Sequence, residues 1–205
     1  RIASIHNGQR TEYLLDPIGL VNVVGEYDGA GDLLAQYTHG FGLVSRVDAT
    51  GAAAYYDFDA IGSTAGLSGP DGDYLNHYRY LPFGERLDAV ETVANPFAYV
   101  GEWGVMDEQN GLNYMRARHY IELIGRFIQA DPIGINGGFN LYTYAGNSPM
   151  VWNDPGGLLF GLPDSPKYTK SDGTKTHKDP GEWRTPEECQ EAERRREEER
   201  KQEEY

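Results

Sequence analysis

The sequence predicts a mainly β protein made of antiparallel hairpins, and three observations lead to this fold class. Turn signals of the form Asp-x-x-Gly recur through the first part of the chain, about 11 residues apart with an occasional skipped beat. Short segments of alternating apolar and polar residues lie between them, which is typical of strands with one buried face. Aromatic residues are dense, since 13 of the 15 tyrosines precede residue 159. Strand, turn and strand at this spacing give an extended sheet of hairpins.

The predicted turns share one chemistry, because Asp can bond its own backbone and Gly tolerates a positive φ. They start at Asp16, Asp28, Asp48 and Asp59, and a variant spans Leu81–Gly84. The segments expected to be strands are, in chain order, 19–27, 33–47, 52–58 and 74–83. Spacing alone leaves open whether the sheet is open, barrel-like or spiral.

Charge and composition exclude several classes of function. The formal net charge is −14, and so acidic a protein is a poor nucleic-acid binder because phosphate neutralisation needs Lys and Arg. No apolar run is long enough to span a membrane. Cys189 is the single cysteine, which excludes an internal disulfide, and the five histidines show no metal spacing, so no metal or other cofactor is expected. The first residue is Arg1 rather than Met, and we expect a processed chain or a piece of a longer protein.

The composition changes sharply near residue 158. Residues 1–158 contain eight arginines and no lysine, whereas residues 159–205 contain five of each. Thr185, Pro186 and Glu188 form a helix start signal, but the segment that follows has almost no apolar stripe. We therefore expect residues 159–205 to be a polar tail that is partly helical or disordered.

A set of linked landmarks lies between residues 78 and 158. They are YLPFGERL (80–87), NPFAYVGEW (95–103), GLNYMRARHYIELIGRFIQADPIG (111–134) and NLYTYAGNSPMVWNDPGGL (140–158). In this order and spacing they resemble the core domain of RHS (rearrangement hotspot) proteins. The resemblance extends more weakly over residues 1–77, which look like the tyrosine-aspartate repeats of that family. It implies three parts: hairpin repeats at 1–77, a core domain at 78–158, and a variable C-terminal tail at 159–205 that is the start of a cargo region or a linker.

The resemblance also implies an architecture and an activity. Repeats of the family wind into a hollow spiral β-shell, the core domain plugs one end, and many members cut their own chain just after an Asp-Pro-x-Gly-Leu motif. The matching motif residues here are Asp154, Pro155, Gly157 and Leu158. The predicted scissile bond is Leu158–Leu159, which coincides with the change in composition. The two aspartates and the arginine of the family's autoprotease match Asp131, Asp154 and Arg118.

Chemistry supports this assignment of a carboxylate pair. Asp-Pro-x-Gly occurs three times, and we interpret Asp16 as a turn only, because it falls on the repeat beat. Peptide hydrolysis needs a base that activates water and an acid that protonates the carbonyl oxygen or the leaving amine. Two carboxylates that share a site can supply both, since repulsion keeps one protonated while the other ionises. A nearby arginine can hold a carboxylate ionised or stabilise the developing oxyanion.

Three functions compete at this point. The first is a shell-closing core domain of a secreted bacterial polymorphic toxin, exported to the cell surface or into a target cell, which cuts itself once after Leu158. Its partners would be its own C-terminal region, held inside the shell, and immunity or secretion-system proteins. The second is a non-cleaving structural or adhesion module in which the Asp-Pro-x-Gly motifs are only turns. The third places a toxin activity in residues 159–205, and is disfavoured because 47 mostly polar residues bury little core.

Overall fold

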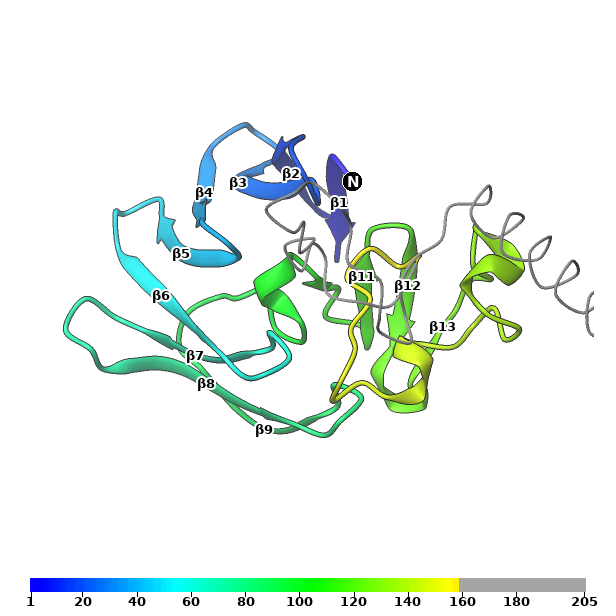
Figure 1. Cartoon of the computed structure of the whole chain (residues 1–205). Coiled ribbons are helices and arrows are strands. Elements are labelled where there is room, and N and C mark those ends of the chain that lie inside the picture. Colours follow the sequence, from blue (N-terminus) through cyan, green and yellow to red (C-terminus); the bar gives the residue numbers. More distant parts are fainter. Residues whose placement is uncertain (159–205) are drawn as a thin grey trace, which may run out of the picture. The chain divides into compact units, whose positions relative to one another are not determined.

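Within residues 1–158, the part of the chain that the computed structural model describes, nine strands form one antiparallel sheet. Each strand pairs with the next along the chain, so the sheet is a continuous meander (Figure 1). These residues belong to one structural unit. The strands are β1 (Ala3–His6), β2 (Gln9–Asp16), β3 (Asn22–Asp28), β4 (Leu33–His39), β5 (Leu43–Asp48), β6 (Ala53–Phe58), β7 (Thr64–Ser68), β8 (Tyr74–Tyr80) and β9 (Arg86–Glu91).

The Asp-x-x-Gly turns connect these strands through local hydrogen bonds. Between β3 and β4, Oδ1 of Asp28 accepts the N–H groups of Ala30 and Asp32, both at 2.9 Å. Gly31 closes this turn with a φ of 90°, a conformation that costs other residues energy. The same bonds recur in the turns that start at Asp48 and Asp59. The sequence therefore specifies each of these hairpins within a few residues of its turn.

One face of the nine-stranded sheet carries a hydrophobic core. Strands β4, β6 and β8 bury alternate residues, as a strand with one covered face must. The stretch that follows β9 packs on this face, where the rings of Tyr37 and Phe97 meet edge-on with centroids 4.9 Å apart. The buried members of the cluster are Val23, Ala35, Tyr37, Leu43, Ala54, Tyr56, Leu67, Tyr78, Phe97 and Met106.

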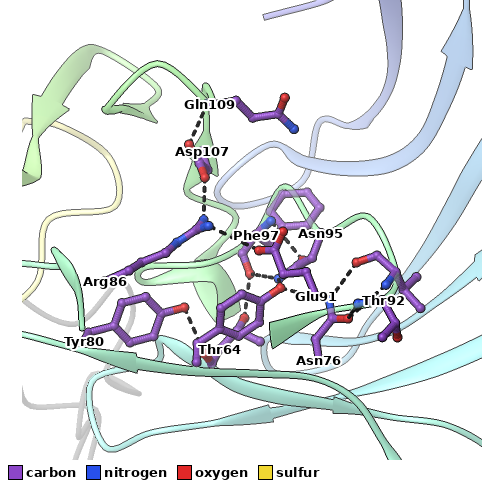
Figure 2. Close-up of polar contacts among 12 residues, drawn as sticks. Thr64, Asn76, Tyr80, Arg86, Glu91, Thr92, Asn95, Phe97, Asp107 and Gln109 are labelled. Atoms are coloured by element: carbon purple, nitrogen blue, oxygen red, sulfur yellow. Dashed lines mark hydrogen bonds and ion pairs between the residues drawn. The ribbon is translucent and has the colours of Figure 1, made fainter. Parts of the chain in front are cut away.

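Polar contacts join this following stretch to the sheet (Figure 2). The Thr64 hydroxyl donates to the carbonyl of Phe97 at 2.6 Å, and the Tyr56 hydroxyl donates to Oδ1 of Asn95 at 3.0 Å. Arg86 in β9 forms an ion pair with Asp107. These polar groups are therefore hydrogen-bonded or ion-paired where the stretch after β9 packs on the sheet. Burying them without partners would cost free energy.

A second, smaller sheet of four antiparallel strands follows in the described part of the chain. It consists of β10 (Met106–Asp107), β11 (Leu112–Met115), β12 (Arg118–Ile121) and β13 (Arg126–Phe127). Short 3₁₀ turns accompany it: η1 (Gly101–Trp103), η2 (Glu122–Ile124), η3 (Gly134–Gly137) and η4 (Ala145–Asn147). Its core is aromatic, and the rings of Tyr120 and Tyr144 lie 4.3 Å apart between centroids.

The β8–β9 turn rests directly on this aromatic core. Gly84 has a φ of 97°, and a Cβ at this position would lie 2.7 Å from the ring of Tyr99. Only glycine lets the turn approach the ring this closely. The contact packs the nine-stranded sheet against the domain that carries the second sheet.

Each of the four predicted segments contains a strand, but three differ from the structure by more than one residue. The segment 19–27 becomes a strand only at Asn22, after a turn. The segment 33–47 forms two strands, because Gly40, Phe41 and Gly42 make a turn between β4 and β5. The segment 74–83 stays extended only to Tyr80, after which the Leu81–Gly84 turn begins. Strands β1, β2, β7 and β9 were not predicted from the sequence. The helix expected after Thr185 lies outside the described residues, and the division of the chain at residues 77 and 78 stays a prediction, although β8 runs across it.

Glu26 in β3 should make stability depend on pH. Its Oε2 accepts the Tyr37 hydroxyl at 3.1 Å, and burial raises the pKa of Glu26 against the opposing effects of that bond and of Arg46. Because the folded-state pKa exceeds the unfolded value, Glu26 contributes stability that is present below the unfolded pKa and lost as the pH rises through the folded pKa. We expect Glu26→Gln, which keeps an acceptor for Tyr37, to gain stability over the wild type between about pH 4 and pH 7.

Thermal unfolding at the two pH values measures this difference. Glu12→Gln is the matched control, because Glu12 is an exposed glutamate of the same sheet and its substitution should shift both midpoints equally. An equal gap between Glu26→Gln and the wild type at both pH values would contradict the prediction.

Candidate functional site

The three residues predicted to be catalytic lie together in the structure. Nη2 of Arg118 is 3.0 Å from Oδ2 of Asp131 and 3.0 Å from Oδ2 of Asp154. Arg118 begins β12, Asp131 follows β13, and Asp154 lies in the loop after η4. All three are buried, with Arg118 and Asp154 each 2% exposed. The two carboxylates are therefore neighbours on either side of one guanidinium nitrogen.

The rest of the Arg118 side chain is held by its surroundings. Nε donates to the carbonyl of Gly157, and Nη1 donates to the carbonyl of Leu141 at 3.1 Å. The guanidinium lies over the ring of Phe127, 3.6 Å from its centroid. Burial lowers the pKa of Arg118, while Asp154 and Asp131 oppose the shift. A side chain with this many partners is fixed in one geometry before any reaction begins.

Asp154 both faces Arg118 and shapes the turn that leads to the predicted cut. Its Oδ1 accepts the N–H of Leu158 at 3.1 Å, and its carbonyl accepts the N–H of Gly157 at 3.1 Å. Pro155 and Gly157 are buried, and Leu158 is 37% exposed. Leu159, the other side of the predicted scissile bond, lies outside the described residues. We define the segment Asp154–Leu158 as the motif turn.

Asp131 is arranged in the same way as Asp154. Its Oδ1 accepts the N–H of Ile133 at 3.0 Å within its own Asp-Pro-x-Gly turn, while Oδ2 faces Arg118. Asp16, the third aspartate of this kind, also bonds its own turn, because its Oδ1 accepts the N–H of Ile18 at 3.0 Å. None of the ion pairs found within residues 1–158 includes Asp16. Two of the three Asp-Pro-x-Gly aspartates, Asp131 and Asp154, therefore contact Arg118, and Asp16 only stabilises its own turn.

This arrangement can support acid–base chemistry at a peptide bond. Two adjacent carboxylates can exchange a proton with water and with a leaving amine, and a fixed guanidinium can stabilise negative charge. In the described part of the chain no group of three or more His, Cys, Asp or Glu side chains is placed to hold a metal ion. The same residues form no helix long and apolar enough to cross a membrane.

Arg116 is a residue of this site that was not predicted from the sequence. Arg116 lies at the tip of the β11–β12 hairpin, and its Nη1 donates to the carbonyl of Pro155 at 2.7 Å. The sequence places Arg116 beside Arg118 and offers no local signal that separates their roles.

The chain is similar in sequence to several bacterial proteins, some of which are toxins. No family model matches it. It is 30% identical to a tRNA(Glu)-specific nuclease WapA of Bacillus subtilis subsp. natto over 192 residues, which are 90% of this chain and 8% of that protein. It is 36% identical to the toxin protein Tse5 of Pseudomonas aeruginosa over 111 residues, 53% of this chain and 8% of that protein. The chain therefore spans only a small part of the length of these relatives.

Solved structures agree with the fold. The structure of TcdB2-TccC3-TEV superposes with a TM-score of 0.57 at 21% identity, over 73% of this chain and 8% of that chain. The predicted fold class, mainly β with antiparallel hairpins, is confirmed, and Tc toxin structures are among its structural neighbours. The relatives with toxin in their names match about half of the chain, and the tRNA nuclease matches 90% of it. These toxin relatives agree with the resemblance to RHS proteins that the sequence shows, and membership of that family stays a proposal.

Gly157 should be the most sensitive backbone position of the motif turn. Its φ is 65°, and a Cβ there would lie 2.3 Å from the carbonyl oxygen of Met115. We expect Gly157→Ala to reduce the free energy of unfolding by on the order of 1–3 kcal/mol, because the turn must move off the β11–β12 hairpin.

Gly156→Ala is the matched control for this substitution. A Cβ at Gly156 would meet nothing closer than Oδ1 of Asp154 at 3.9 Å, so its effect should stay below about 0.5 kcal/mol. Urea denaturation followed by tryptophan fluorescence measures both variants. Equal effects of the two substitutions would contradict the tight packing of Gly157.

Proposed function

We propose that this chain is the self-cleaving, shell-closing core region of an exported bacterial toxin and that it cuts its own backbone once, between Leu158 and Leu159. The observation that carries the proposal is the buried Arg118 guanidinium between Asp131 and Asp154, beside the turn that ends at Leu158. Structural turns alone do not require two buried carboxylates around one arginine.

The proposed reaction is a hydrolysis by a carboxylate pair. The ionised carboxylate removes a proton from water as the water oxygen attacks the carbonyl carbon of Leu158. The protonated carboxylate supplies a proton to the leaving nitrogen, and the carbon–nitrogen bond breaks. Leu158 ends as a carboxylate, Leu159 as an amine, and one water is consumed. Asp131 and Asp154 act as a pair, because Oδ2 of each lies 3.0 Å from the same nitrogen of Arg118.

The motif turn supplies the proximity that such a reaction needs. Asp154 lies four residues before the bond and already binds the N–H of Leu158. Holding the bond beside the carboxylates in the same chain removes a bimolecular entropy cost on the order of 7–11 kcal/mol in favourable cases. Slow intrinsic chemistry is sufficient, because each chain is cut only once.

The larger protein would use this cut to separate its parts. We propose hairpin repeats at 1–77, a core domain at 78–158, and a cargo region or linker that begins at residue 159. In this scheme the cargo stays inside the shell after the cut, and secretion and immunity proteins are further partners. The toxin names of several relatives and the similarity of the fold to Tc toxin structures support this assignment.

One observation favours a second function, a non-cleaving structural module. Each carboxylate oxygen of the pair already has a partner: Oδ1 of Asp131 and of Asp154 bonds its own turn, and Oδ2 of each faces Arg118. A group so placed can also act as a clamp that closes the chain onto the core. The two functions differ in a single measurable property, the integrity of the Leu158–Leu159 bond.

Substitution of either aspartate should abolish the cut. We expect the wild-type chain to yield two fragments, residues 1–158 and 159–205, whose masses sum to that of the chain plus one water. Asp154→Asn and Asp131→Asn should remain one intact chain, because an amide can neither accept the proton from water nor donate an acidic one. Intact mass spectrometry under denaturing conditions measures all three proteins.

Asp16→Asn is the matched control for both variants. It alters the same Asp-Pro-x-Gly motif at a site away from Arg118, and should be cut like the wild type. A cut that persists in Asp154→Asn would exclude the carboxylate mechanism. An intact wild-type chain would favour the structural clamp.

A further inference from the structure

The tip of the β11–β12 hairpin binds the motif turn through three consecutive contacts. Nη1 of Arg116 donates to the carbonyl of Pro155 at 2.7 Å. The backbone N–H of Ala117 donates to the carbonyl of Gly156 at 3.2 Å. Nε of Arg118 donates to the carbonyl of Gly157. Three successive residues of the hairpin thus hold three successive carbonyls of the motif turn, in register.

Arg116 also connects the motif turn to the nine-stranded sheet. Its Nη2 donates to the carbonyl of Trp103 at 2.7 Å and to Oδ1 of Asn22 at 3.2 Å, and its Nε donates to the carbonyl of Leu20. Leu20 and Asn22 belong to the β2–β3 connection and the start of β3. One side chain therefore joins four parts of the chain: the β2–β3 connection, η1, the hairpin tip and the motif turn.

The partners of Arg116 indicate that it positions the turn rather than forming an ion pair. Each of them is a neutral oxygen, and no ion pair within residues 1–158 includes Arg116. Burial lowers the pKa of Arg116 to about 10. Its backbone has a φ of 52°, which is unfavourable for a residue with a Cβ. A half-buried cation with no ion pair on a strained backbone is a poor source of stability, and its hydrogen bonds to the turn suggest an orienting role instead.

We propose that Arg116 is a positioning residue of the self-cleaving site, and that with Ala117 and Arg118 it sets the register of the motif turn and so selects Leu158–Leu159 as the bond that is cut. The inference rests on the proposed function. A shift of one residue along an extended chain moves a peptide bond by about 3.3–3.6 Å, which would place a different bond beside the carboxylates. Without the Pro155 contact, the first of the three carbonyls is no longer fixed.

Arg116→Gln and Arg116→Lys test this role in the full 205-residue chain. Cell-free translation followed by denaturing quenches at set times gives the rate and the position of the cut by intact mass. We expect Arg116→Gln to be cut at least about 10-fold more slowly after Leu158, and Arg116→Lys, which keeps one charged donor, to recover part of the rate. The pH at which cleavage is half-maximal should not move in Arg116→Gln, because the carboxylate pair and Arg118 remain.

Arg126→Gln is the matched control. Arg126 is a half-buried arginine of the same small sheet, and its Nη1 donates to the Thr143 hydroxyl rather than to the motif turn. It should be cut at the wild-type rate. Thermal unfolding of Asp154→Asn with and without Arg116→Gln, both uncut, separates slow cleavage from failure to fold.

A second variant tests the register itself without changing a side chain. One glycine inserted between Gly156 and Gly157 lengthens the motif turn by one residue, and should abolish the cut after Leu158. Wild-type rates after Leu158 in both the insertion and Arg116→Gln would overturn the inference while leaving the proposed function intact. An uncut wild type would overturn both, and would be recognised before any variant is measured.

Discussion

A single buried charge, the guanidinium of Arg118, is the interaction on which the C-terminal part of the described chain depends. It satisfies two carboxylates and two backbone carbonyls at once, from Asp131, Asp154, Leu141 and Gly157. Buried charges are costly unless they are paired and hydrogen-bonded, so the loops that carry these groups must come together around it. The same contacts that meet this electrostatic requirement align the motif turn. In this region, stability and the proposed chemistry come from one set of contacts.

The nine-stranded sheet supports this arrangement from outside. The aromatic face of the sheet packs against the stretch that includes Phe97, and the β8–β9 turn rests on the ring of Tyr99. The sheet also contacts the residue just before the motif turn, because the Asn153 amide donates to the carbonyl of Ile61 at 3.0 Å. The hairpins therefore also take part in holding the site. They provide backbone acceptors that hold the site in place.

The parts of the fold that could be predicted from the sequence are those with local causes. Asp28 and Gly31 specify their turn within a few residues, so the hairpin of β3 and β4 can be predicted from the local sequence. Strand β7 could not be predicted, because its five residues include a glycine and show little alternation of apolar and polar side chains. Arg118, Asp131 and Asp154 were identified through a family resemblance, since Arg118 meets the two aspartates across 13 and 36 residues of chain. Nothing in the sequence separates Arg116 from Arg118, because the partners of Arg116 lie up to 96 residues away.

Because hairpin contacts are local and the contacts of the site are distant in sequence, we expect the hairpins to form first. Neighbouring strands of the meander are consecutive in the chain, so each hairpin closes a short loop and can form early. The contacts of Arg116 with Leu20 and with Pro155 close loops of 96 and 39 residues, and they require both sheets to be in place. We therefore expect the site to be among the last features to form during folding. Hydrolysis of a peptide bond is not reversed by unfolding, so a chain cut after Leu158 would carry a permanent record that it had once folded.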